Sequence, residues 1–166
     1  MFAVGEKIVY PVHGAGVIEA IESREILGES RSYYVLRLST GELRVLVPVE
    51  TADKIGVRPV SCRAKLDQVR EVLADRASPW EDNWNRRYRL NMDKIKSGDV
   101  CELAEVVRNL TLRDKARGLS AGEKKMLDNA RKILLSELIL AADLTPEDAV
   151  SRLDFMLEVQ DQAPDK

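Results

Sequence analysis

One short segment places a large aromatic side chain beside three arginines. Trp84 is followed by Arg86, Arg87 and Arg89, and Trp80 precedes it by one helical turn. Guanidinium groups hold phosphates, and a flat indole ring can stack on a base or wedge into a base step. The alternative is that both tryptophans are core residues and the arginines form a solvated helix face. The residue types therefore leave two interpretations open, nucleic-acid contact and plain packing.

A second basic pair, Lys124 and Lys125, follows the start of a later segment and could add phosphate contacts or simply lie on the surface. Residues 78–142 hold 13 basic and 10 acidic side chains, whereas residues 143–166 hold 2 and 7, and the formal net charge is -2. Such a mild positive bias is compatible with phosphate contact but too small for tight binding to bulk DNA. If the chain touches DNA, another partner must bring it there.

Catalytic chemistry has little support in this sequence. His13 lies in a glycine-containing turn without a serine or cysteine nucleophile beside it, and no glycine-rich phosphate loop is present. Cys62 and Cys101 form no CxxC pair, so no zinc site can be assembled, and free, buried thiols in a reducing compartment are expected. We therefore expect a protein that is not an enzyme and has no catalytic residue, no metal, no cofactor and no small-molecule substrate.

Hydropathy predicts a cytosolic protein. No apolar run approaches the length of a membrane span, and no signal-peptide core follows the first methionine. No heptad seam is evident, which favours a monomer.

The first sixty residues have the pattern of short strands. Strands are predicted at 7–10, 17–24, 32–38, 42–47 and 57–60, with a hairpin turn at Leu27-Gly28-Glu29 and a further turn at 52–56. Five short strands in this length fit a small SH3- or Tudor-like barrel. We assign residues 1–62 to this domain.

The periodicity then becomes helical, which makes the fold class α+β. Ser78-Pro79-Trp80-Glu81 predicts a helix start, and Asp99 and Ser120-Ala121-Gly122-Glu123 predict two more. A first helix around Leu66–Leu73 and a last one from Thr145-Pro146 complete a compact all-α domain at 63–160. Residues 161–166 are expected to be a disordered tail.

Four blocks in order resemble the CarD/CdnL family of bacterial transcription regulators. They read VGEKIVYPVHG at 4–14, NWNRRYR at 83–89, AEVVRNL at 104–110 and RGLSAGEKKML at 117–127. The first block also resembles a module of the transcription-repair coupling factor helicase, but nothing helicase-like follows it. The likeness covers about residues 4–158.

The resemblance implies a partner and a site. Family members bind the β subunit of RNA polymerase through the barrel, contact promoter DNA through the helical domain and stabilise the open promoter complex. The matching tryptophan is Trp84, which would wedge into the minor groove at the upstream edge of the bubble. Trp80 has no clear counterpart and is interpreted as packing. Localisation would be cytoplasmic, with association to the nucleoid through polymerase.

The physics of a wedge agrees with this implication. A bubble edge is already partly unstacked, so inserting a ring there costs less than in a closed duplex. A stack worth ~1–3 kcal/mol would change the ratio of open to closed complexes by roughly 5- to 150-fold. Arg86, Arg87 and Arg89 would position the ring on the backbone, with Lys124 and Lys125 adding contacts. Contacts of this kind carry little sequence specificity.

The strand predicted at 42–47 is short, ends at Pro48 and could present an exposed edge to a strand of the polymerase. Its candidate contact residues are Leu43, Arg44, Val45 and Leu46. Arg24 matches a family position that often carries arginine. Some members carry a basic residue where this chain has Leu46, and Arg44 could supply that charge. The alternative is that Arg24 and Arg44 are solvated strand residues.

Two other functions remain open on the sequence. The chain could be a protein-interaction adaptor that makes no direct contact with DNA. It could also be an RNA- or ribosome-binding barrel, which would require an aromatic or basic surface on the first domain.

Overall fold

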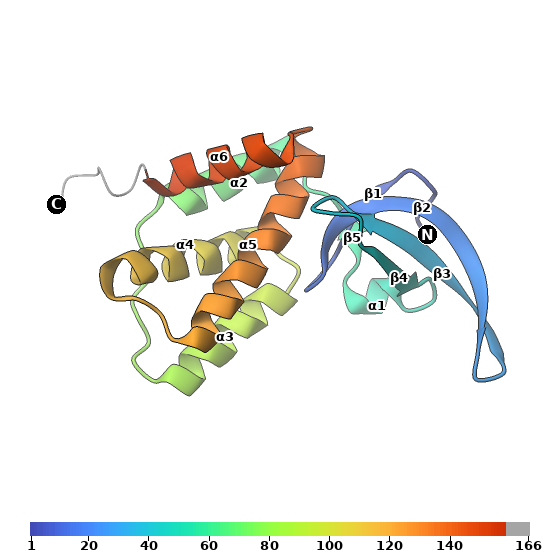
Figure 1. Cartoon of the computed structure of the whole chain (residues 1–166), viewed down its shortest axis with the longest axis horizontal. Helices are drawn as coiled ribbons and strands as arrows, with labels where there is room; N and C mark the ends of the chain where they lie inside the picture. The colour runs from blue at the N-terminus through green and yellow to red at the C-terminus, as the bar shows by residue number, and fades with distance from the viewer. Residues whose placement is uncertain (159–166) are drawn as a thin grey trace.

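The computed structural model describes residues 1–158, and Figure 1 shows a twisted sheet on one side and a group of helices on the other. The predicted tail at 161–166 and the last residues of the predicted helical domain lie outside the described part. The strands are β1 Lys7–Tyr10, β2 Gly14–Ile26, β3 Glu29–Leu38, β4 Arg44–Pro48 and β5 Arg58–Pro59.

The sheet is antiparallel with the strand order β4-β3-β2-β1-β5. Strands β2 and β3 form a long hairpin that projects away from the helices (Figure 1). Its two-residue turn is Leu27-Gly28, with φ values of 53° and 79°. Two positive φ angles define the type I′ turn, whose twist matches that of the strands. The hairpin predicted at this position is confirmed.

The predicted α+β class and the five strands are confirmed, but the sheet is not closed into a barrel. Strands β4 and β5 stand at its two ends. Because β5 has only two residues and pairs with β1, it leaves the β4 end without a partner strand among residues 1–158. Ile8, Ile18, Tyr34, Leu36 and Val47 form a small core of this part of the chain.

The bounds of every strand except β1 differ from the prediction: β3 begins earlier, β4 is shifted towards the C-terminus and β5 is shorter. Strand β2 is longer than 17–24 at both ends. The turn predicted at 52–56 contains one helical turn, α1 Ala52–Ile55, which ends at Gly56 in the left-handed conformation with φ 89°. Glycine adopts that conformation without a steric penalty, so it ends the turn there.

The helical part consists of α2 Arg63–Ala74, α3 Trp84–Lys96, α4 Val100–Arg117, α5 Ala121–Ala141 and α6 Pro146–Glu158. The caps predicted at Asp99 and Ser120 are confirmed. The Asp99 side chain accepts hydrogen bonds from the backbone N–H of Cys101 and Glu102, and Ser120 accepts one from Glu123. Helix α5 buries an apolar stripe of Met126, Ala130, Ile133, Leu134 and Leu138.

The helix start predicted at Ser78 is wrong. Helix α3 begins at Trp84, after Asn83, whose side chain accepts a hydrogen bond from the backbone N–H of Arg86. Ser78 serves tertiary contacts instead: its backbone N–H donates to Asn109 and its hydroxyl donates to Glu105. These partners lie on α4, far along the chain, so the local capping pattern could not reveal them.

Helix α5 joins the two parts. The buried Ser136 hydroxyl accepts a 2.8 Å hydrogen bond from the N–H of Ala15, and the carbonyl of Ser136 accepts one from the Ser39 hydroxyl. The next residue, Glu137, binds Arg58 and Ser61. The N-terminal end of α5 lies far from the sheet, whereas its C-terminal half lies against it (Figure 1).

The remaining expectations concern cysteines, His13 and membranes. Both cysteines are free, but Cys62 is exposed rather than buried, because it precedes the first turn of α2. Burial raises the pKa of the Cys101 thiol. His13 is an exposed residue of the turn between β1 and β2, as predicted. Within residues 1–158, no helix is both long and apolar enough to cross a bilayer.

Candidate nucleic-acid interface and free sheet edge

Trp84 is a large aromatic side chain that stays exposed and is nevertheless held in place. It is 43% exposed at the first position of α3. Its ring stacks on Tyr88, with centroids 5.2 Å apart, and its indole N–H donates a 3.2 Å hydrogen bond to the Ser120 hydroxyl. The ring also covers Gly122, where a Cβ atom would lie 3.5 Å from it. These contacts fix the ring orientation while leaving much of its surface open.

Arg87 does not point outward with the other arginines. Its guanidinium donates to both carboxylate oxygens of Glu123, at 2.8 and 3.0 Å, and to the carbonyl of Glu81 at 2.7 Å. The two charged side chains are only 12% and 4% exposed. The structure therefore gives Arg87 an internal role, tying α3 to the start of α5, in place of the phosphate contact expected for it.

Trp80 packs in the same region, as interpreted from the sequence. It is half-buried against the helical core, and the guanidinium carbons of Arg87 and Arg113 each lie 4.3 Å from the centre of its ring. Cations at this distance are attracted to the face of an indole. Trp80 thus supports Arg87, which in turn supports the position of Trp84.

The ion pair also sets the protonation of its members. Hydrogen bonds from Arg87, opposed by burial, lower the pKa of the Glu123 carboxyl below 4.5, and further hydrogen bonds from Ser120 and Trp84 act in the same direction. The hydrogen bond to Glu123 raises the pKa of Arg87. Both groups therefore stay charged at neutral pH, and the pair persists.

The other predicted DNA contacts are exposed on α3 and α5. Arg89, Lys124 and Lys125 face solvent. Arg86 is 72% exposed in its side chain and lies 3.7 Å from a carboxylate oxygen of Glu81, a loose surface pair. Lys124 and Lys125 lie in the first turns of α5, directly after Glu123. These four basic side chains are thus open to solvent and can meet phosphates.

The segment before α3 is anchored by a polar network. Arg108 is buried and donates to the carbonyl of Val72 and to the Ser78 hydroxyl. Glu105 accepts from Ser78 and from Lys94. Burial opposes ionisation of Glu105, but these two hydrogen bonds lower its pKa overall. The network fixes the irregular segment and with it the point where α3 begins.

Sequence reasoning did not identify three residues of this site. Ser120 and Glu123 were recognised only as a capping box, and Tyr88 only as part of a motif. The capping box signalled a helix start, but both of its side chains also reach α3, 36 residues away. Tyr88 lies one turn after Trp84, a spacing at which helical side chains contact each other, so this stack could have been found.

The predicted polymerase-contacting strand is β4, and it lies at an end of the sheet. Leu43 precedes it and is 64% exposed, while Val45 and Leu46 are half-buried. Arg44 donates a 2.7 Å hydrogen bond to Glu19, which also lies 3.3 Å from Arg37. The hydrogen bond from Arg44 lowers the pKa of Glu19. The charge of Arg44 is thus partly occupied within the sheet.

Arg24 does not lie beside this edge. It is on β2 opposite Arg31 of β3, whereas Arg44 of β4 faces Arg37. Arg31 and Arg37 are six residues apart on one strand, which is about 20 Å. Arg24 pairs with Glu22 at 3.1 Å near the exposed end of the hairpin. The structure therefore separates Arg24 from Arg44, and a single short strand on β4 cannot contact both.

Comparison with known proteins gives this geometry a context. A family model described as CarD, C-terminal domain, matches residues 68–154, and one described as CarD-like/TRCF RID domain matches residues 2–61. The second match implies an interaction with RNA polymerase in general. The chain is also 44% identical over 149 residues, covering 87% of this chain and 95% of the relative, to the Bacillus subtilis (strain 168) protein named "Putative transcription factor YdeB". The chain therefore belongs to the CarD-like family of transcription factors.

Proposed function

We propose that the chain binds the β subunit of RNA polymerase through the β4 edge and stabilises the open promoter complex by placing Trp84 in the minor groove at the upstream edge of the bubble. Membership of the family supports a role in transcription regulation. Neither catalysis nor a bound cofactor is part of this proposal.

The observation that carries the proposal is the exposed but fixed indole of Trp84. Tryptophan is highly buried on average, so an indole that is 43% exposed is unusual. Its ring is oriented in advance by Tyr88 and Ser120, so little conformational freedom is lost on binding. Arg86 and Arg89 on the same helix, and Lys124 and Lys125 in the first turns of α5, are exposed basic side chains that can bind phosphates.

The wedge acts because it favours one state of the promoter. A ring that inserts at a bubble edge binds the open complex better than the closed one, and only such a difference in affinity shifts an equilibrium. Stacking of about 1–3 kcal/mol corresponds to a roughly 5- to 150-fold change in the ratio of open to closed complexes.

Recruitment by polymerase supplies the affinity for promoter DNA that the net charge of this chain does not. With a net charge of -2, the chain has little affinity for bulk DNA. Binding to polymerase raises the local concentration of Trp84 at the promoter. The free edge of β4 supports this role, since an added strand gains main-chain hydrogen bonds there.

The test is the half-life of a heparin-challenged open complex with wild-type chain, with Trp84→Ala, or with no added chain. We expect the wild type to lengthen the half-life several-fold and Trp84→Ala to lose most of that effect while binding polymerase normally. Trp84→Phe should retain part of it, because a smaller ring can still stack.

The adaptor and RNA-binding functions give different results. An adaptor would tolerate Arg86→Glu combined with Arg89→Glu in every DNA complex, whereas the proposed function requires weaker promoter binding. An RNA-binding sheet domain would retain RNA at low salt in the full chain even after Trp84→Ala. Equal half-lives for wild type and Trp84→Ala would contradict the wedge.

A further inference from the structure

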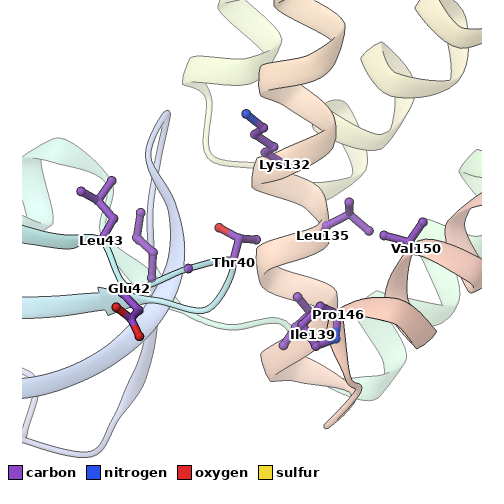
Figure 2. Close-up of a pocket in the computed structure, with 10 residues that line it drawn as sticks. Thr40, Glu42, Leu43, Lys132, Leu135, Ile139, Pro146 and Val150 are labelled. Atoms are coloured by element: carbon purple, nitrogen blue, oxygen red, sulfur yellow. The ribbon is translucent and has the colours of Figure 1, made fainter.

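An apolar groove of about 400 Å³ lies between the loop that joins β3 to β4 and the helices α5 and α6. Figure 2 shows its two walls, with Thr40, Glu42 and Leu43 on the loop side. The apolar lining residues are Leu38 and Leu43 from the sheet domain, Leu135 and Ile139 from α5, and Pro146 and Val150 from α6. The groove is thus built by both domains.

The apolar side chains that line the groove are unusually exposed to water. Leu43 is 64% and Val150 38% exposed, and Leu135 and Ile139 are half-buried. Exposed apolar side chains that gather in one concave place mark a binding surface more often than a solvated one. The charged lining residues are Glu42 and Lys132, one of each sign. The floor of the groove therefore fits an apolar group, not an ion.

The position of the groove indicates what covers it. Leu43 lines the groove and directly precedes Arg44, the first residue of β4. Strand β4 is the end of the sheet, and its outer edge has no partner strand in the described part of the chain. Successive residues of a strand are about 3.3 Å apart, so a segment that pairs with β4 as far as Arg44 reaches Leu43 with its next residue. The groove is therefore continuous with the free edge.

We propose that the polymerase segment that pairs along β4 continues past Leu43 and seats a large apolar side chain, such as leucine or phenylalanine, in this groove. This inference rests on the proposed function and adds to it a contact of the helical domain with polymerase. A bound segment would then touch β4, α5 and α6 together. Its binding would also add to the contacts between the two domains, because the same side chain contacts both.

The first experiment measures the affinity of the full chain for RNA polymerase by biolayer interferometry. Val150→Glu puts a carboxylate into the groove, and Phe155→Glu makes the same charge change on an exposed position of the same helix that does not line the groove. We expect Val150→Glu to weaken binding at least roughly tenfold, as for loss of one buried apolar anchor, and Phe155→Glu to change it less than about twofold. Equal affinities for Val150→Glu and wild type, or equal losses in both variants, would overturn the inference.

The second experiment does not depend on the folding of a charged variant. The photo-cross-linker p-benzoylphenylalanine is placed at position 150, 155 or 46, and the cross-linked polymerase peptides are mapped by mass spectrometry. Positions 150 and 46 should capture neighbouring parts of one polymerase segment, and position 155 should capture none of it. Capture of unrelated segments, or none from position 150, would overturn the groove contact.

The same set of variants separates this inference from the proposed function. Arg44→Glu changes the β4 edge without touching the groove. If Arg44→Glu weakens polymerase binding and Val150→Glu does not, the edge contact stands and the groove contact is wrong. If Arg44→Glu leaves polymerase binding unchanged and a cross-linker at position 46 captures no polymerase peptide, the proposed edge contact itself is wrong.

Discussion

The buried carboxylate of Glu137 binds the guanidinium of Arg58 through two hydrogen bonds, 2.7 Å from Nη1 to Oε1 and 2.9 Å from Nη2 to Oε2. The same carboxylate accepts from the backbone N–H and the hydroxyl of Ser61. Arg58 also donates to the carbonyl of Gly98. A residue of the sheet is thus clamped between α5 and the turn before α4.

This clamp links the two proposed contact surfaces. Ser120 at the start of α5 holds the ring of Trp84, and Glu137 near its other end holds the sheet. Glu137 lies 17 positions after Ser120, which is about 25 Å of helix at 1.5 Å per residue. Because a helix of this length is stiff, α5 fixes the separation between the tryptophan and the sheet.

Removing the Glu137 side chain should strongly destabilise the fold. Glu137→Ala removes the carboxylate that accepts from Arg58 and Ser61, and loss of one member of a buried pair costs roughly 3–5 kcal/mol. Urea unfolding followed by circular dichroism measures the change. The matched control is Asp154→Ala, which removes the more exposed partner of Arg131 and should cost about 0–1 kcal/mol. Similar losses in both variants would contradict a structural role for the clamp.

Arg87 and Arg89 are two residues apart, but their substitution should affect different properties, stability for Arg87 and promoter binding for Arg89. Arg87→Ala leaves the buried Glu123 carboxylate unpaired and should lower the free energy of unfolding by roughly 3–5 kcal/mol. Arg89→Ala should change stability by less than about 0.5 kcal/mol. It should instead weaken promoter binding and reduce the salt dependence by about one released ion. Denaturation measures the first effect, and a salt titration of polymerase–promoter binding measures the second. A large stability loss in Arg89→Ala together with none in Arg87→Ala would refute this assignment.

Acid should weaken the contact between α3 and α5. The pKa of Glu123 lies below 4.5 in the folded chain, held there mainly by the hydrogen bonds from Arg87, and returns towards 4.5 on unfolding. A lowered folded pKa stabilises the fold above the unfolded pKa, and this contribution is lost as the pH falls through the folded value. Urea unfolding at a series of pH values measures it. Glu123→Gln should be less stable at neutral pH and should lose less stability on acidification below about pH 4.5 than wild type.

The Ser120 hydroxyl should affect function as well as stability. Ser120→Ala removes both the helix cap and the acceptor of the Trp84 indole, with a loss of about 1 kcal/mol from the cap. The heparin-challenged open complex should then decay faster than with wild type. Ser120→Thr, which keeps a hydroxyl, should restore the half-life. A variant that loses stability but keeps the wild-type half-life would show that the ring needs no anchor at Ser120.

Much of the fold was predictable because its signals are local. The alternation of apolar residues predicted five strands, and the Leu27-Gly28 turn followed from the positive φ that glycine permits. The caps at Asp99 and Ser120 were equally local. The start of α3 was not, because Ser78 is held by Glu105 and Asn109, residues far along the chain.

The sequence by itself determined the two-part order of strands and helices, the family resemblance and Trp84 as the central candidate residue. The tertiary structure decided that the sheet stays open at β4, that Arg87 is an internal residue and that Arg24 lies away from the edge. It also decided the orientation of the two parts through Glu137. The physical reason is that periodicity and capping act over a few residues, whereas a buried charge finds its partner only when distant segments pack together.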